Sequence, residues 1–387
     1  MIQPTNFCVP TMLEEHSCFA IPCIKLVAVD IGYSGVKCFT DRVHACFPSL
    51  ARQVDADSFI GEPNPDDILY RDERGTWAVG ASALREISLH DTNDSERTLY
   101  ARKRYDSEIF KIIFRVSMGL CLMGEKEFAT GGGRPIFLQT GLPPAYMESD
   151  SQDLICALSG DHLFQIRYGR KQWKEFCFEL RSDHINVMPQ PMGSLYSASI
   201  GSDGKPLQEA KDYFRAGILG LDPGFLTVDT FELRNGGIKS FDSFDTFGMK
   251  TVYKRLSDKI KDRHGVYIPV HAIQKVLIDG YVQVFDKKNM QTSNVPVAEL
   301  LAQSSREVCE EAIEKIKVTY NYLQDYKYLL VAGGTGEAWT EYITQHFSGM
   351  HNLEIIFGNQ VEPALPQIFS NVRGYYFRCA GQLRSRQ

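Results

Sequence analysis

The chain has 387 residues, of which 43% are hydrophobic and 11% aromatic, so it can bury a large core and is long enough for two domains. Its formal net charge of −6 argues against a surface dominated by direct nucleic-acid binding. No apolar run reaches the length of about 18 residues that a bilayer requires, so the sequence predicts no membrane-spanning helix.

The ten cysteines contain no Cys-x-x-Cys pair and show no zinc-finger spacing with histidine. We interpret them as the reduced thiols of a cytoplasmic protein rather than as disulfides or zinc ligands. Residues 1–23 precede the first predicted strand and lack the basic start and apolar centre of a signal peptide. We therefore expect them to form an N-terminal extension.

The first predicted element is a strand, a glycine turn and a returning strand. Leu26–Val29 form an apolar run that leads into Asp30, and Gly32 and Gly35 allow a tight turn whose backbone amides can approach an anion. Lys37 lies on the returning strand, where its ammonium group can reach the same anion. An acid for a hydrated cation, bare amides and a lysine suit a nucleotide phosphate with Mg2+.

The next part of the chain is predicted to mix loops, one long helix and several strands. Residues 51–75 are expected to form a loop with an edge hairpin, and a helical pattern extends from Ser95 to Met123. Thr130–Pro135 lacks the Gly-Lys-Ser/Thr ending of a P-loop, so we interpret it as a flexible turn. Further strands are expected at residues 136–142, 164–168, 176–180 and 185–189.

Basic residues gather near the start of the long helical pattern. They are Arg97, Arg102, Lys103 and Arg104. We expect them to form a solvated helix face, and a contact with a subunit or an acidic partner is the alternative.

Gln190 lies just beyond a predicted strand, between Pro189 and Pro191. A neutral amide at such a place can orient a water molecule but cannot abstract a proton strongly. The residues alone leave open the alternative that it is an ordinary loop glutamine. Residues 192–200 then favour a helix.

The strand–turn–strand pattern occurs again at residues 219–229. The two stretches share Asp-x-Gly-aromatic-x-x-Val, which aligns Asp30 with Asp222 and Gly32 with Gly224. Such internal similarity predicts two related halves, and two hairpins that face each other would close on one cation from opposite sides. Two unrelated hairpins with similar turns are the alternative.

A third glycine turn follows a second long predicted helix. The helix spans residues 297–323, the strand after it spans 328–331, and a further helix is expected to open at Glu337. Glycines at a helix N-terminus allow a flat ring or a phosphate to lie close to the backbone. Asn371–Phe377 alternates aromatic and small residues, which suits a final helix or strand packed against the first half.

Together the three turns resemble the phosphate-1, phosphate-2 and adenosine motifs of the actin/Hsp70/sugar-kinase superfamily. They are Asp30-x-Gly-x-x-Gly-x-Lys37, Asp222-x-Gly-x-x-Thr-x-Asp229 and Val331-Ala-Gly-Gly-x-Gly336. Within the superfamily the chain is most similar to the bacterial ParM/StbA plasmid-segregation actins. The supporting stretches are Trp77–Gly80, Gln139–Pro143, Val187–Gln190 and Asn371–Gly374.

The resemblance implies an α/β protein with two related ribonuclease H-like (actin-like) domains around a central nucleotide cleft. Domain I would span residues 24–215 and be completed by 356–387, and domain II would span 216–355. It implies a slow ATPase that binds ATP, or GTP, with Mg2+ and polymerises into nucleotide-gated filaments for plasmid or DNA segregation. The implied partners are further copies of the chain and a DNA-binding adaptor protein, without direct contact to nucleic acid or membrane.

The resemblance also implies a role for each site residue. Asp30 and Asp222 would hold Mg2+ through water molecules, Lys37 would contact the phosphates, and Gln190 would orient the attacking water, so Asp30, Asp222 and Gln190 form the expected catalytic group. The other expected nucleotide-binding residues are Gly32, Tyr33, Ser34, Gly35, Gly224, Phe225, Thr227, Gly333, Gly334, Thr335 and Gly336.

The chain departs from the family motif at its second turn. Phe225 and Leu226 stand where glycine and threonine are usual, and Pro223 precedes Gly224. A small-molecule kinase of the same superfamily is the alternative from another functional class, but it would need a catalytic aspartate where this chain has Gln190. A non-polymerising ATPase scaffold is a third possibility.

Overall fold

The structure, a computed structural model, describes residues 3–55, 63–87, 101, 103–129 and 133–385. The described residues belong to two compact units. Unit N consists of those within residues 10–86, 93–213 and 357–387, and unit C of those within residues 1–9, 87–92 and 214–356. This division does not test the domain boundaries that the sequence predicts, and it does not test whether the two halves are related. Both stay predictions.

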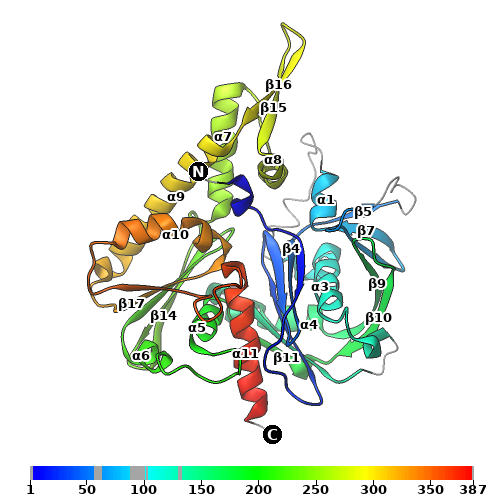
Figure 1. Cartoon of the computed structure of the whole chain (residues 1–387), viewed down its shortest axis with the longest axis vertical. Coiled ribbons are helices and arrows are strands. Elements are labelled where there is room, and N and C mark those ends of the chain that lie inside the picture. Colours follow the sequence, from blue (N-terminus) through cyan, green and yellow to red (C-terminus); the bar gives the residue numbers. More distant parts are fainter. Residues whose placement is uncertain (1–2, 56–62, 88–100, 102, 130–132, 386–387) are drawn as a thin grey trace. The chain divides into compact units, whose positions relative to one another are not determined.

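The main sheet of unit N, to which the strands β4 and β11 of Figure 1 belong, has six strands in the order β1-β4-β3-β2-β8-β11. The central strand β2 is buried along its whole length, as its continuous apolar run predicts, and it pairs antiparallel with β3 and parallel with β8. The six strands are β1 (Met12–Glu15), β2 (Lys25–Ile31), β3 (Gly35–Phe39), β4 (Val43–Pro48), β8 (Ile136–Leu142) and β11 (Ile185–Pro189).

Part of the expected N-terminal extension belongs to this sheet. Strand β1 pairs antiparallel with β4, with Met12 opposite Cys46 and Glu15 opposite Val43. The expectation of a separate extension over residues 1–23 is therefore wrong for these four residues. A short edge strand carries too little periodic pattern to be recognised from sequence.

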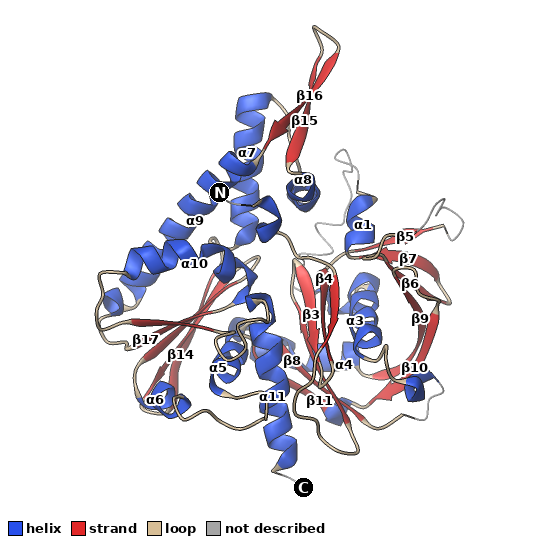
Figure 2. Cartoon of the chain, viewed as in Figure 1, coloured by secondary structure: helices blue, strands red, loops and turns tan. Residues whose placement is uncertain are grey.

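Helices cover both sides of the main sheet (Figure 2). Helix α11 packs against α5, β2 and β8, and α3 packs against β2, β3 and β4. The tail predicted as a helix or strand is the helix α11. The helices are α3 (Glu108–Cys121), α4 (Met147–Leu158), α5 (Pro191–Ser199) and α11 (Ser370–Arg384).

Helix α3 begins later than its sequence pattern predicts. Ser107 is its N-cap, and its side chain accepts a hydrogen bond from the backbone N–H of Phe110 at 3.2 Å. Arg104 lies before the helix, in a 3-10 turn at Arg104–Asp106. The early part of the predicted helix at residues 95–100 and the turn at residues 130–132 lie outside the described residues.

A second sheet of unit N is antiparallel, in the order β10-β9-β6-β7-β5. Buried and exposed residues alternate along β10, which confirms the predicted hairpin with β9. A short helix, α1 (Ala81–Arg85), follows β7. The strands are β5 (Ala51–Val54), β6 (Ile68–Asp72), β7 (Gly75–Val79), β9 (Gly160–Tyr168) and β10 (Lys174–Leu180).

Unit C contains the sheet β14-β13-β12-β17-β18 and a separate hairpin, β15–β16. The second predicted strand–turn–strand is confirmed as β12 and β13, which pair antiparallel with Asp222 opposite Asp229. The strands are β12 (Ile218–Pro223), β13 (Val228–Arg234), β14 (Gly237–Phe244), β15 (Tyr281–Asp286), β16 (Gln291–Pro296), β17 (Tyr328–Val331) and β18 (Glu354–Phe357).

The helices of unit C include α9, which confirms the second long helix that the apolar periodicity predicts. They are α7 (Met249–His264), α8 (Ile273–Asp279), α9 (Ala298–Thr319) and α10 (Gly333–Phe347), and α6 (Ala210–Arg215) lies at the boundary between the units. Helix α10 begins at Gly333, four residues before the predicted start at Glu337, since the glycines continue the helix instead of forming a separate turn. Within the described residues, no helix is both long and apolar enough to cross a membrane.

Candidate nucleotide site

Three of the predicted residues meet at the carboxyl end of β2. Asp30 is the last residue but one of this buried strand and is only 6% exposed. Lys37 stands opposite it on β3 and places its Nζ 3.5 Å from Asp30 Oδ2. Gln190 donates a hydrogen bond from Nε2 to Asp30 Oδ1 at 2.9 Å. A carboxylate, an ammonium group and an amide therefore converge within unit N.

The turn after Asp30 requires a residue without a side chain at Gly32. A Cβ there would lie 2.7 Å from the carbonyl oxygen of Gly35 and 3.1 Å from Lys37 Nζ. A larger residue would therefore push the returning strand or the lysine away. Ser34 anchors the other end of the turn, because its carbonyl oxygen accepts a hydrogen bond from the backbone N–H of Ser49 at 3.0 Å.

Arg104 braces this turn, a role that the sequence did not reveal. Its guanidinium group lies 4.1 Å from the ring centroid of Tyr33 and donates to the carbonyl oxygens of Gly32, at 3.2 Å, and Ile31. Burial lowers the pKa of Arg104 from its usual range. The expectation of a solvated helix face is therefore wrong for Arg104, which lies before the helix and points into the fold.

Gln190 is held in place by its backbone and by a close-fitting glycine. Its N–H donates to the carbonyl oxygen of Leu142 at 2.8 Å, and it occupies the N-cap position of α5. A Cβ at Gly141 would lie 2.1 Å from Tyr375 Oη and 3.1 Å from Gln190 Cγ. Gly141 was missed by sequence reasoning, although it follows the Gln139-Thr140 pair of a stretch that supports the resemblance.

The second turn places Asp222 beside the start of α10. Asp222 is buried near the end of β12, and Gly333, the first residue of α10, has a φ of +76°. A Cβ at Gly333 would lie 2.6 Å from Asp222 Oδ1, so the helix backbone approaches the carboxylate as only glycine permits. The positive end of the α10 dipole favours negative charge at this place, whether a carboxylate or a phosphate.

Backbone hydrogen bonds hold the Gly224 turn against α7. The carbonyl oxygens of Gly224 and Phe225 accept from the N–H groups of Met249, at 3.1 Å, and Lys250, at 2.8 Å. The Phe225 ring is buried and packs edge-on against Tyr253, with 5.7 Å between ring centroids. A nucleotide contact by Phe225 would therefore have to come from its backbone.

Two threonines belong to the same region of unit C. Thr335, in the first turn of α10, donates from Oγ1 to the carbonyl oxygen of Gly224 at 3.1 Å, and thus ties the second turn to the third. The carbonyl oxygen of Thr227 accepts from the N–H of Gly224 at 2.8 Å. Gly334 and Gly336 follow Gly333 in the first turn of α10.

Asp229 is a buried carboxyl group next to Asp222 that sequence reasoning named only as the end of a motif. Burial, and to a lesser degree the charge of Asp222, raises the pKa of Asp229 to about 7. A hydrogen bond from Ser243 Oγ to Asp229 Oδ1 at 2.6 Å opposes this shift. Asp229 therefore exchanges its proton close to neutral pH.

The carboxylates of Asp30 and Asp222 suit a hydrated Mg2+ ion better than a metal that is bound by protein side chains alone. Among the described residues, no group of three or more His, Cys, Asp or Glu side chains could hold a metal ion together. Mg2+ commonly keeps several water ligands and is bound through one or two carboxylates plus substrate phosphates. Asp30 and Asp222 supply carboxylates of that kind, one in each unit.

Comparison with known proteins identifies the fold. Residues 28–193 match the family described as actin-like proteins, N-terminal domain. A non-polymerisable quadruple mutant of pCBH ParM is 18% identical with a TM-score of 0.68, over 93% of this chain and 99% of that one. The ParM of a 15-stranded filament from Clostridium botulinum is also 18% identical with a TM-score of 0.68, over 92% and 99%.

A third solved structure resembles the chain over a similar length. It is the complex with ADP of Ta0583, an archaeal actin homologue, with 15% identity and a TM-score of 0.59 over 92% of this chain and 99% of that one. No curated protein matches the chain. At these identities the solved structures establish the fold of the chain.

Proposed function

Since this chain is an actin-like protein with the fold of ParM, we propose that it binds ATP with Mg2+ and polymerises into nucleotide-gated filaments. The convergence of Lys37 and Gln190 on Asp30 is the observation that carries this proposal, because it brings an ammonium group and an amide to one buried carboxylate. GTP in place of ATP would use the same groups.

The residues of unit N would act mainly by positioning. Asp30 and Lys37 would fix the phosphate end of the nucleotide, and the Gly32–Gly35 turn would offer backbone amides to it. Gln190 would orient the attacking water, but its neutral amide cannot serve as a strong base. Hydrolysis would therefore depend on electrostatics and alignment, and we expect it to be slow.

The residues of unit C would complete the site. Asp222 would hold Mg2+ through water ligands, and the bound ion would neutralise charge on the phosphates. The backbone around Gly224 would face the phosphate end of the nucleotide. Gly333, Gly334, Thr335 and Gly336 lie at the start of α10 and would flank the adenosine. ATP would favour addition of subunits, and hydrolysis would weaken the contacts between them.

Plasmid or DNA segregation in the cytoplasm is the cellular role that we propose for such filaments. With a net charge of −6, the chain is better suited to reach DNA through a DNA-binding adaptor protein than by direct contact. The kinase alternative is weaker, because Gln190 hydrogen-bonds to Asp30 and offers no base to a substrate hydroxyl group.

Sedimentation tests this proposal. We expect the purified chain to pellet with Mg2+ and ATPγS and to remain in the supernatant with ADP or without nucleotide. Asp30→Ala is the control, since it removes the carboxylate that Lys37 and Gln190 contact. A chain that never pellets with ATPγS, even at high protein concentration, would overturn the filament.

A further inference from the structure

The β15–β16 hairpin projects from unit C as an isolated two-stranded sheet (Figure 2). Val282 is buried at its base, whereas every residue from Phe285 to Asn294 is exposed. Among the described residues, no third strand pairs with it. Two-stranded hairpins are only marginally stable in water, so a partner surface would stabilise this one.

The tip of the hairpin combines apolar surface with positive charge. Phe285 is 51% exposed and Met290 is 75% exposed, although both are large hydrophobic residues. Lys287 and Lys288 stand between them in the sequence and are exposed as well.

The turn holds this tip in a defined conformation. Asp286 accepts hydrogen bonds from the backbone N–H of Lys288 at 2.8 Å and from Nδ2 of Asn289 at 2.7 Å. Met290 has a φ of +54°, which is uncommon for a residue other than glycine. The carboxylate of Asp286 is thus used inside the turn, and the two lysines dominate the charge that the tip presents.

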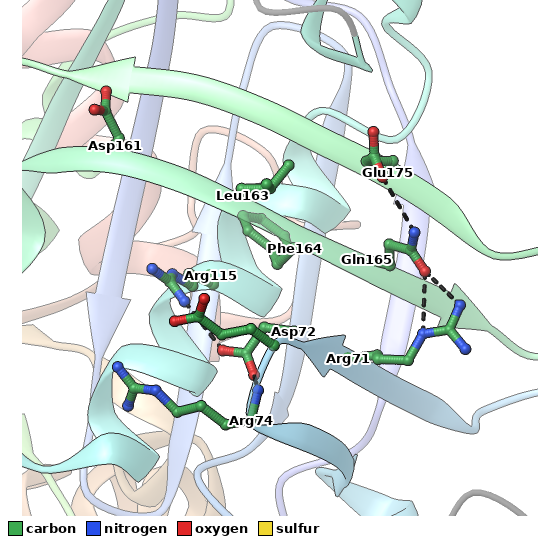
Figure 3. A pocket seen from close by; sticks show the side chains of 10 residues that line it. Arg71, Asp72, Arg74, Arg115, Asp161, Leu163, Phe164, Gln165 and Glu175 are labelled. Atoms are coloured by element: carbon green, nitrogen blue, oxygen red, sulfur yellow. Dashed lines mark hydrogen bonds and ion pairs between the residues drawn. The ribbon is translucent and has the colours of Figure 1, made fainter.

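Unit N carries a surface of complementary character. A pocket of about 550 Å³ opens beside strands β6 and β9 (Figure 3). Leu163, which is 61% exposed, and Phe164 line it, so part of its surface is apolar. A pocket of this volume is large enough for one or two protruding side chains.

Ion pairs neutralise several charges around this pocket. Arg115 Nη1 lies 3.3 Å from Asp72 Oδ2, and it also donates to Tyr70 Oη at 2.9 Å. Arg74 Nη1 lies 3.2 Å from Glu108 Oε1. These two guanidinium groups therefore add little free positive charge to the pocket.

The remaining charges make the pocket acidic. Within the described chain, Glu73 and Asp161 form no ion pair, and Glu175 accepts a hydrogen bond from the neutral amide of Gln165 at 3.1 Å. The one remaining guanidinium among the lining residues is that of Arg71, which donates to Gln165 Oε1 at 3.1 Å. Carboxylates thus outnumber cations where Leu163 is exposed.

We propose that the β15–β16 tip of one copy of the chain docks into this acidic pocket on unit N of a second copy. Phe285 and Met290 would cover Leu163, and Lys287 and Lys288 would face Glu73 and Asp161. This inference rests on the proposed function, because it supplies one of the subunit contacts that a filament needs.

The two surfaces are different parts of the chain, so each copy could offer its tip to one neighbour and its pocket to another. Repeated from copy to copy, such a contact adds subunits head to tail, in a ring or an open filament. Because the lysines are exposed at the tip, the contact should weaken as the salt concentration rises.

Zero-length crosslinking tests the contact directly. Unlabelled and 15N-labelled full-length chains are mixed with Mg2+ and ATPγS and treated with a carbodiimide, which joins lysine to carboxylate only at contact distance. We expect mixed-isotope peptide pairs that link Lys287 or Lys288 to Glu73, Asp161 or Glu175. The absence of such pairs, while other mixed-isotope pairs form, would overturn the inference.

Charge reversal tests whether the contact supports assembly. We expect Lys287→Glu/Lys288→Glu and Glu73→Lys/Asp161→Lys each to raise the concentration needed for pelleting about tenfold or more, as the loss of roughly 1.4 kcal/mol would produce. The four changes together should recover at least half of the loss on a logarithmic scale. Lys254→Glu/Lys261→Glu, on the exposed face of α7, is the matched control for Lys287→Glu/Lys288→Glu, because it changes the net charge by the same amount.

The outcomes separate this contact from the filament itself. A chain that pellets without the expected crosslinks, or whose combined variant recovers nothing, would overturn the contact and leave the filament. A chain that forms the crosslinks without pelleting would overturn the filament and leave the contact. Lysine-dependent binding to duplex DNA without the crosslinks would assign the tip to nucleic acid and overturn the inference.

Discussion

The two aspartate turns share a sequence pattern but differ in what surrounds the carboxylate. Asp30 contacts Lys37 Nζ and Gln190 Nε2, and the turn after it is braced by the Arg104 side chain. Asp222 instead lies beside the start of α10 and opposite a second buried carboxyl group, Asp229. The first turn is therefore surrounded by side-chain donors, and the second by backbone and a titrating acid.

This difference assigns different tasks to the two turns. The donors around Asp30 are suited to phosphate and water, whereas Asp222 lies beside the N-terminus of α10, where the helix dipole favours negative charge. Sensitivity to pH near neutrality belongs to the second turn, since the pKa of Asp229 is raised there to about 7.

Removal of the Asp222 carboxylate is expected to have the largest effect. Asp222→Ala should weaken Mg2+-dependent binding of ATPγS by about 100-fold or more, since a charged ligand of the hydrated cation is lost. Isothermal titration calorimetry with and without Mg2+ measures this change, and a thermal melt verifies the fold of the variant. Unchanged affinity would show that the second turn is no part of the site.

Asp229→Asn should change the pH dependence of stability. The pKa of about 7 in the folded chain lies above the usual 3.8, so the protonated form stabilises the fold fully below about pH 4, and this contribution is lost as the pH rises through 7. The asparagine stays neutral, so the variant should not lose this contribution, which is on the order of a few kcal/mol. Urea unfolding between pH 5 and 8 measures it, in the absence of nucleotide.

Parallel pH profiles for the wild type and Asp229→Asn would contradict the raised pKa. Asp183→Asn is a suitable control, because Asp183 is an exposed carboxylate whose pKa is lowered by Arg181. That control should leave the slope between pH 5 and 8 as in the wild type, since its titration is complete below this range.

Gly333→Ala measures the close approach of α10 to Asp222. The change should destabilise the chain by about 1–2 kcal/mol through the positive φ alone, and by more through the Cβ placed 2.6 Å from Asp222 Oδ1. Gly280→Ala is the matched control, with a φ of +78° and no atom near the added Cβ. Equal losses in the two variants by urea unfolding would show that the approach to Asp222 carries no cost.

Gln190→Ala should have the smallest effect on binding and a clear effect on turnover. Without the amide, the water loses its orienting group, so phosphate release should slow about tenfold while ATPγS affinity stays within about twofold of the wild type. A coupled phosphate assay and calorimetry measure the two quantities. A large loss of affinity would instead make Gln190 a ligand-holding residue that positions Asp30.

Much of the fold could be predicted because its signals are local. The buried run at β2, the alternation along β10 and the apolar stripe of α9 each depend on residues only a few positions apart. The errors lie where local pattern is weak or misleading. The edge strand β1 is only four residues long, and the start of α10 is glycine-rich, which favours a turn in isolation.

The candidate chemical groups can be recognised from the sequence alone: an acid, glycines and a lysine in one turn, and an acid with glycine in another. Which of these groups meet depends on the fold, because Gln190 and Asp30 are 160 positions apart and approach through the pairing of β2, β8 and β11. The fold also places Arg104, which the sequence suggests is a surface charge, against the carbonyl oxygen of Gly32, and its burial of Asp229 raises the pKa of that carboxyl group. Register and burial depend on packing between distant segments, and no local pattern records them.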